Sequence, residues 1–217
     1  LAGAGGVKGR LGRAYVNARG YRGGCLAIVG VEGTREDVDF RRERALSLAR
    51  RFGGLPVGRS PGQAWLRARY SAPYLRDELL TRGVLVETLE TAAQWSSLHE
   101  LHREVAAAIG QALDACGTPG LVMCHLSHVY ESGASLYFTF LARQRDGDEI
   151  GQWRAVKDAA SEAILANGGT ITHHHAVGVD HARFMEREVG TGGLGALRAL
   201  KAQLDPAGIM NPGKLLV

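Results

Sequence analysis

Apolar and polar side chains alternate along the chain with two different periods. Val38, Ala45 and Ala49 recur at the spacing that places them on one face of a helix. Residues 83–90 instead alternate apolar and polar positions, as a half-buried strand does. The same patterns predict strands at 24–32, 83–90, 121–130 and 134–142, and helices at 35–52, within 64–80, at 97–116, at 149–166, near 180–189 and near 193–204.

Short polar and glycine-rich signals mark the ends of these elements. Thr34 is a natural N-cap, and Ser97-Leu98-His99-Glu100 has the pattern of a capping box. Residues 131–133, Glu-Ser-Gly, form the short loop of a hairpin. Hairpin-connected strands interleaved with helices predict an α+β fold, a ferredoxin-like antiparallel sheet covered by helices, with C-terminal helices and a tail.

Length and composition fit a folded domain. The chain has 217 residues, of which 45% are hydrophobic and 22% are charged, and these values exclude disorder and a collagen-like structure. No apolar run approaches the ~18 to 20 residues that a membrane-spanning helix needs. The 30 glycines are about twice the average share and indicate many turns. Because the chain opens in a glycine-rich stretch without Met, we expect residues 1–23 to be a linker from a missing N-terminal domain and residues 24–217 to form one domain.

The charge balance is basic, with 26 Lys and Arg against 22 Asp and Glu. Such an excess suits nucleic acid, an anionic small substrate or an acidic neighbouring domain, and it also occurs as an ordinary solvated surface. The basic residues are not interleaved with aromatic ones as in single-strand binders, so we expect no nucleic-acid partner. Three cysteines without C-x-x-C spacing indicate a reducing compartment, which predicts a cytoplasmic protein.

A histidine triplet at 173–175 is the strongest candidate for chemistry. It lies in the polar loop 170–178, where imidazoles can bind a metal or move protons near neutral pH. A polar loop without a function is the alternative. A second pair, His125 and His128, lies on a predicted strand. Three positions apart on a regular strand, these imidazoles face opposite sides, which argues against a shared metal.

Two tyrosines and one arginine complete the candidates. Tyr130 and Tyr137 flank the predicted hairpin loop, and a phenol hydroxyl can donate or relay a proton when its surroundings match its pKa to the task. Packing side chains are the alternative. Arg76 has the two-pronged donor geometry that binds a carboxylate or a phosphate. An exposed helical arginine paired with Asp77 or Glu78 is the alternative for this residue.

Four segments together resemble a known family of flavoenzymes. The tail 205–216, DPAGIMNPGKLL, is similar to the ending of FAD-linked oxidases of the vanillyl-alcohol oxidase superfamily. The segments YLRD at 74–77, YESGASLYFTF at 130–140 and ANGGTITHHHAVG at 166–178 are more specific. They resemble alkyldihydroxyacetonephosphate (alkylglycerone-phosphate) synthase and its bacterial relatives over roughly residues 24–217.

The resemblance implies that the chain is a substrate, or cap, domain that closes over an FAD held mainly by a separate N-terminal domain. It also implies roles for single residues. The catalytic residues would be Tyr137, as acid/base, and the flavin-side histidines His173, His174 and His175. The substrate-binding residues would be Arg76, Tyr130 and His128. The cofactor-binding residues would be His174, His175 and Asn211.

The implied chemistry is FAD-dependent and acts on a small anionic substrate that carries a phosphate or a carboxylate. In the synthase an acyl chain leaves and an alcohol enters without net redox change, whereas relatives oxidise 2-hydroxy acids or alcohols. The glycine-rich phosphate-binding segment of the FAD domain is absent from the sequence, so the chain alone should bind FAD poorly or not at all. The GH-x-GDGN-x-H segment of D-2-hydroxyacid dehydrogenases is also missing, which favours the synthase-like branch and weakens a metal site.

The expected partners are the chain's own N-terminal FAD domain and a second copy in a homodimer. The expected cytoplasmic location is compatible with peripheral contact with a membrane. Two hypotheses from other classes stay open: a stand-alone ferredoxin-like module that binds an anion or nucleic acid through an arginine-rich helix, and a metal enzyme that uses His125, His128 and the triplet.

Overall fold

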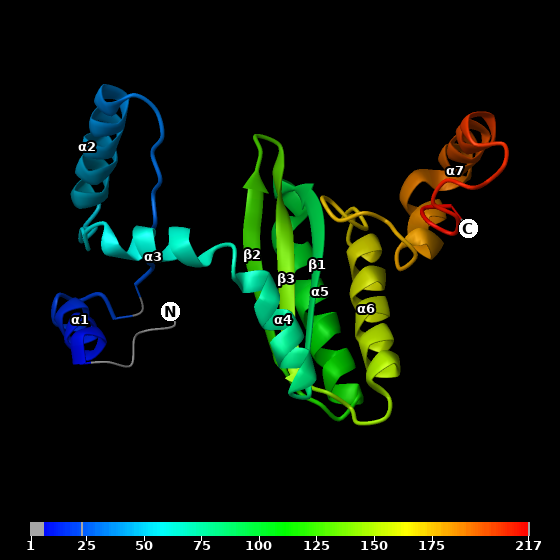
Figure 1. Cartoon of the computed structure of the whole chain (residues 1–217), viewed down its shortest axis with the longest axis horizontal. Helices are drawn as coiled ribbons and strands as arrows, with labels where there is room; N and C mark the ends of the chain where they lie inside the picture. Colours follow the sequence, from blue (N-terminus) through cyan, green and yellow to red (C-terminus); the bar gives the residue numbers. More distant parts are fainter. Residues whose placement is uncertain (1–6, 23, 217) are drawn as a thin grey trace. The chain divides into compact units, whose positions relative to one another are not determined.

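A computed structural model of the chain describes residues 7–22 and 24–216 (Figure 1). The chain forms two compact units that divide between Ala72 and Pro73. The second unit holds the sheet and all the candidate active-site residues, whereas the arginine-rich helix lies in the first unit.

The first unit is helical. Its elements are α1 (Val7–Ala18), α2 (Arg35–Arg51) and α3 (Ser60–Ala68). Thr34 is the N-cap of α2, because its hydroxyl oxygen accepts a hydrogen bond of 3.3 Å from the Asp37 backbone N–H. The strand expected at 24–32 is wrong, since this segment has irregular backbone. A strand needs a neighbour for its backbone groups, and the described part of this unit contains no second strand.

The second unit contains one antiparallel sheet of three strands. These are β1 (Val84–Gln94), β2 (Leu121–Val129) and β3 (Gly133–Arg143), in the order β1-β3-β2. The hairpin expected around residues 131–133 is confirmed, because β2 and β3 pair directly on either side of it. The α+β class is confirmed as well, with helices packed on one face of the sheet.

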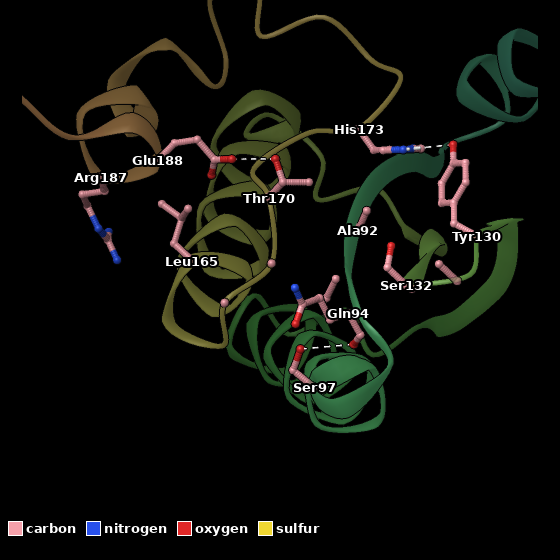
Figure 2. Close-up of a pocket in the computed structure, with 15 residues that line it drawn as sticks. Ala92, Gln94, Ser97, Tyr130, Ser132, Leu165, Thr170, His173, Arg187 and Glu188 are labelled. Carbon is pink, nitrogen blue, oxygen red and sulfur yellow. Dashed lines mark hydrogen bonds between the residues drawn. The ribbon is translucent and has the colours of Figure 1, made fainter. Parts of the chain in front are cut away.

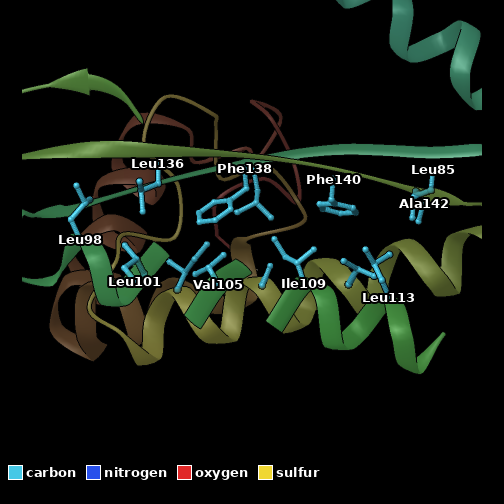
Figure 3. Packing of buried hydrophobic residues seen from close by; sticks show 14 of the residues in the cluster. Leu85, Leu98, Leu101, Val105, Ile109, Leu113, Leu136, Phe138, Phe140 and Ala142 are labelled. Carbon is cyan, nitrogen blue, oxygen red and sulfur yellow. The ribbon is translucent and has the colours of Figure 1, made fainter. Parts of the chain in front are cut away.

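Two long helices, α5 (Trp95–Ala115) and α6 (Glu149–Ala166), cover that face of the sheet (Figure 3). Even-numbered side chains of β3, such as Phe138 and Phe140, pack against the apolar stripe of α5 and are fully buried. The alternation along the strands therefore decides which face is covered. We call the other side of the sheet the open face. It carries the odd-numbered side chains of β3 and the even-numbered ones of β1.

The capping box expected at Ser97 is wrong. Helix α5 begins two residues earlier, with Gln94, the last residue of β1, as its N-cap. The Ser97 hydroxyl donates a hydrogen bond to the Gln94 carbonyl instead of capping the helix. The Trp95 indole N–H reaches the carbonyl oxygens of Tyr130 and Glu131, which ties the first turn of the helix to the hairpin loop.

The remaining elements of this unit are α4 (Ala72–Thr81), the short 3₁₀ helix η1 (Ala182–Phe184) and α7 (Met185–Leu204). Helix α7 is interrupted at Gly190, whose φ of +73° and ψ of 166° are not helical, so the two terminal helices expected near 180–189 and 193–204 are confirmed as its two parts. A second, smaller apolar cluster joins this region to the end of the chain. Its buried members are Ile171, Phe184, Met185 and Leu194, and the partly buried Leu165, Val177, Leu215 and Leu216 pack against them.

None of the helices in the described part of the chain is both long enough and apolar enough to cross a membrane.

The main core gives a direct test of this packing. Phe138→Ala removes a fully buried ring between the sheet and α5, and should lower the free energy of unfolding of the second unit by about 3–5 kcal/mol. Amide hydrogen exchange of β3 measures this loss. Phe52→Ala is the control, because that ring is 82% exposed and its removal should change stability by less than about 0.5 kcal/mol. Equal effects of the two changes would contradict the described core.

Candidate active site

The candidate site lies on the open face of the sheet, where the three strands place polar side chains side by side. Tyr137 of β3 lies opposite Glu90 of β1 and opposite His125 of β2 in the strand register. Directly opposed residues of antiparallel strands point to the same face, so these three side chains share the open face. The histidine triplet reaches the same place from the loop that follows α6, because the His174 backbone N–H donates to Glu90.

That loop passes around the free edge of β1, from the helix-covered face to the open face. On the first side, the Thr91 hydroxyl donates to the Thr170 carbonyl at 2.6 Å, and the Thr170 N–H donates to the Ala92 carbonyl at 3.1 Å. On the second side, the His174 N–H donates to the Glu90 carboxylate at 3.3 Å. Three consecutive residues of β1 therefore bind the loop and position the triplet.

Glycines make this close approach feasible. Gly168 follows Asn167, the C-cap of α6, and has φ at +70°, a conformation that residues with side chains disfavour. At Gly169 a Cβ atom would lie 2.7 Å from the Thr91 hydroxyl and 3.0 Å from the Leu101 side chain. The loop could then not lie against β1 without displacing one of them. The Asn-Gly-Gly sequence before the triplet thus has a packing role.

A glutamate of α7 holds the loop from the outside. Glu188 accepts the Thr170 hydroxyl at 2.6 Å and the Ile171 backbone N–H at 3.0 Å. The contact between Glu188 and Thr170 is visible in Figure 2. The loop is therefore fixed between β1 and the start of α7.

Glu90 is the most buried charged group of the open face, with 4% of the residue exposed. Its carboxylate accepts the Ser135 hydroxyl at 3.0 Å, the Ser127 hydroxyl at 3.3 Å and the His174 backbone N–H at 3.3 Å. Burial raises the pKa of this carboxyl, but the hydrogen bonds from Ser135 and His174 and the neighbouring His173 together outweigh it and lower the pKa below its ordinary value of 4.5. Glu90 is therefore ionised at neutral pH.

A bulge in β2 brings a fourth imidazole to the triplet. The pairing of β2 with β3 shifts between Ser127 and Val129, and His128 has φ at +42°. Bulges redirect side chains in this way. The His128 ring lies with its centroid 4.0 Å from that of His174 and 5.6 Å from that of His173. The expectation that His128 and His125 simply face opposite sides is therefore wrong, because the strand is not regular at His128.

The two tyrosines contact different members of the triplet. The Tyr130 hydroxyl lies 3.4 Å from Nε2 of His173, while the Tyr137 ring meets the His175 ring edge-on at 5.6 Å between centroids. Tyr130 and His173 also line a pocket of about 640 Å³ that continues along the end of β1 toward Glu188 (Figure 2). The site thus has two parts, a pocket beside Tyr130 and an open surface beside Tyr137.

Two of the expected site residues lie apart from this group. The Arg76 guanidinium on α4 is 3.9 Å from the Glu87 carboxylate, and Glu87 accepts the Trp153 indole N–H at 2.5 Å. This pairing involves neither Asp77 nor Glu78. Asn211 is exposed, and its carbonyl accepts the Lys214 N–H within the tail. The roles of Arg76 and Asn211 remain predictions.

Sequence reasoning did not identify Glu90 or its two serine partners. Glu90 occupies an ordinary polar position of the alternating strand, and Ser127 and Ser135 are unremarkable in a hairpin. They meet only through the register of the three strands. The position of Glu90 opposite Tyr137 would have marked it as a site residue, but that position follows only from the strand pairing.

Within the described residues, no group of three or more His, Cys, Asp and Glu side chains has a geometry that could hold a metal ion. Burial raises the pKa of the Cys124 thiol to about 11, so Cys124 is protonated at neutral pH and serves as a small packing residue.

Comparison with known proteins gives a consistent family match. The family model for FAD linked oxidases, C-terminal domain, matches residues 8–215. Alkyldihydroxyacetonephosphate synthase of Dictyostelium discoideum is 32% identical over 202 residues, which cover 93% of this chain and 33% of that protein. The enzyme of the same name from Caenorhabditis elegans is 36% identical over 197 residues, which cover 88% and 33%.

A solved structure of alkyldihydroxyacetonephosphate synthase superimposes with a TM-score of 0.58 at 26% sequence identity, covering 85% of this chain and 31% of that one. The chain therefore spans about a third of the length of the curated relatives it matches.

Gly169 offers a test of how the loop is held. Gly169→Ala places a methyl group against Thr91 and Leu101 and should cost about 1–3 kcal/mol, with faster hydrogen exchange at the Thr170 and His174 amides. Gly192→Ala is the matched control, because it lies in α7 with open space around it and should be neutral or slightly stabilising. Unchanged exchange at both amides in Gly169→Ala would show that the loop is held differently.

The low pKa of Glu90 predicts a pH dependence of stability. A carboxyl whose pKa is lowered by folding stabilises the protein above its ordinary pKa, and the contribution is lost as the pH falls through the folded-state value. Glu90→Gln should therefore destabilise the protein by about 1–3 kcal/mol at pH 7 and by much less near pH 3. Urea unfolding of the two proteins at both pH values measures this difference.

Other carboxyl groups titrate in both proteins, so their effects cancel in the comparison. In a Ser135→Ala background, which lacks one of the hydrogen bonds, the change with pH should shrink. A difference in stability that is the same at pH 7 and pH 3 would refute the lowered pKa.

Proposed function

Since the chain belongs to the family of FAD-linked oxidase C-terminal domains, we propose that it is the substrate-facing part of an FAD-dependent enzyme related to alkyldihydroxyacetonephosphate synthase. One observation carries the proposal. Four imidazoles and two phenols, from β2, the hairpin loop, β3 and the loop after α6, gather in one cluster that includes the ionised carboxylate of Glu90.

The residues of the open face fit a flavin. His174 and His175 are exposed there, and the apolar side chains of Leu121 and Met123 are 57% and 43% exposed on the same face. Apolar surface beside imidazole N–H donors suits a planar ring system whose edge carries nitrogen and oxygen acceptors. His174 and His175 would then hold the ring edge. FAD, when bound, supplies a centre that accepts or donates electron pairs.

The protein side chains would supply proton transfer and substrate binding. Tyr137, whose ring meets that of His175 edge-on, would exchange a proton with a substrate on the open face, and His175 would accept or return that proton. A small anionic substrate on the open face would find hydrogen-bond donors on the imidazoles of the triplet, and Arg76, which lies apart from them, would be a separate anion-binding group. Arg76 is half exposed and has one carboxylate partner at 3.9 Å, a weak pairing that an incoming phosphate can replace.

The test uses the full-length protein that contains this chain, with its flavin bound. We expect it to convert an acyl-dihydroxyacetonephosphate and a long-chain alcohol to the alkyl product, with release of the acyl chain as a free fatty acid. Tyr137→Phe and His174→Ala should each lower kcat by about 100-fold or more, because each removes a group that touches the reacting centre. Arg76→Ala should mainly raise KM, and Arg76→Lys should restore little of it, because lysine lacks the two-pronged geometry.

The outcomes separate the candidates. Flavin reduction by a 2-hydroxy acid or an alcohol, without the exchange reaction, would assign the oxidase function of other relatives. Unchanged turnover in both Tyr137→Phe and His174→Ala would reject the proposed site. Lys214→Ala is the control for a lost positive charge, since Lys214 lies in the tail and should leave kcat unchanged.

A further inference from the structure

We propose that Glu90 is a positioning residue that fixes the tautomer of His173, so that Tyr130, His173 and Glu90 form a proton relay opening into the 640 Å³ pocket. The proposal rests on the function proposed above, to which it adds a second acid/base group. This group is distinct from Tyr137, which contacts His175 instead.

A buried nitrogen of His173 points to this role. Nδ1 of His173 is buried and has no hydrogen-bond partner. The Glu90 carboxylate oxygen lies 3.6 Å away, which is longer than a hydrogen bond. A buried polar atom without a partner is costly, and catalytic hydrogen bonds are often long before a ligand binds. Nδ1 is therefore oriented toward the one carboxylate that can satisfy it.

The chemistry of Glu90 decides where the proton of His173 lies. Glu90 is ionised, and an ionised carboxylate can only accept hydrogen bonds. It already accepts from Ser127, Ser135 and the His174 N–H, so it has no proton to offer to His173. An imidazole facing this group is stabilised when Nδ1 carries the proton. Nε2 is then the acceptor nitrogen of the neutral ring.

The acceptor nitrogen faces a phenol. The Tyr130 hydroxyl lies 3.4 Å from Nε2 of His173 and lines the pocket together with it. When Tyr130 takes a proton from a bound substrate, its own proton passes to Nε2, and Glu90 stabilises the resulting imidazolium. The reverse movement returns the proton to the leaving group. A carboxylate that orients a histidine in this way raises turnover without touching the substrate.

The first experiment reads the tautomer directly. In the chain labelled with ¹⁵N-histidine, nitrogen shifts and two-bond couplings distinguish a protonated Nδ1 from a protonated Nε2. The His173 signals are identified by their loss in His173→Gln. In the unmodified chain at a pH where the ring is neutral, we expect His173 to carry its proton on Nδ1. A proton on Nε2 would overturn the proposal, and this reading does not depend on the folding of a Glu90 variant.

Glu90→Gln should reverse the tautomer. The His174 backbone N–H can only donate, so the carboxamide oxygen must face it, and the NH₂ group must then face Ser127, Ser135 and Nδ1 of His173. The serine hydroxyls can rotate to accept, but Nδ1 must lose its proton. Glu87→Gln is the matched control, because Glu87 is a buried carboxylate on the other face of β1 and should leave the His173 signals unchanged.

The second experiment tests the relay in the full-length flavin-bound protein. Glu90→Gln and Tyr130→Phe should each lower kcat by at least about 10-fold, and Glu90→Gln should change KM little. The kcat of the double variant should be no lower than that of the less active single variant. If the kcat of the double variant falls by the product of the two single losses, the two residues act independently, and the relay is overturned even if Glu90 has a structural role. A correct tautomer switch with unchanged kcat would show that the relay is not used, while leaving the proposed roles of Tyr137 and His174 intact.

Discussion

The binding of one loop to the free edge of β1 is the constraint on which the candidate site depends. Within residues 7–22 and 24–216, strand β1 pairs with β3 on one side only, so its other edge offers backbone groups to the loop that follows α6. Ala92 uses its carbonyl, Thr91 its hydroxyl and Glu90 its carboxylate. Because these residues alternate in direction, they bind the loop on both faces of the strand, and the triplet is carried from one face to the other.

A buried carboxylate at the centre of this arrangement has consequences for stability and for chemistry. An unpaired charge with 4% exposure would be strongly unfavourable, and three hydrogen bonds offset that cost. These bonds also keep Glu90 ionised. The same negative charge that holds the loop through the His174 N–H therefore acts on the imidazole of His173, so the structural anchor and the electrostatic environment of the site are one group.

The parts of the fold that follow from local patterns could be predicted from the sequence. Helix α6 matches its expected range of 149–166, because its apolar spacing and its Asn-Gly-Gly ending are local signals. The hairpin of β2 and β3 follows from its short loop in the same way. The segment 24–32 has the apolar character of a strand, but pairing decides whether a strand forms, and no local pattern records a missing partner.

The residues of the site likewise fall into those that local sequence marks and those that only strand pairing reveals. The triplet, His128, Tyr130 and Tyr137 were recognisable as candidates because they stand in distinctive segments, and the structure brings them together. Glu90 was not recognisable, since its importance comes from strand register and from a loop that is more than eighty residues away along the chain. The bulge at His128 also escaped prediction, because a positive φ at histidine is set by the pairing of β2 with β3 rather than by the residue itself.

The most direct test of the account is a structure of the full-length protein with its flavin bound. We expect the isoalloxazine ring to lie against the open face of the three-stranded sheet, with its edge in contact with His174 or His175 and with Glu90 still buried beneath the loop. A flavin bound far from the triplet, with the open face covered by another part of the protein, would contradict it.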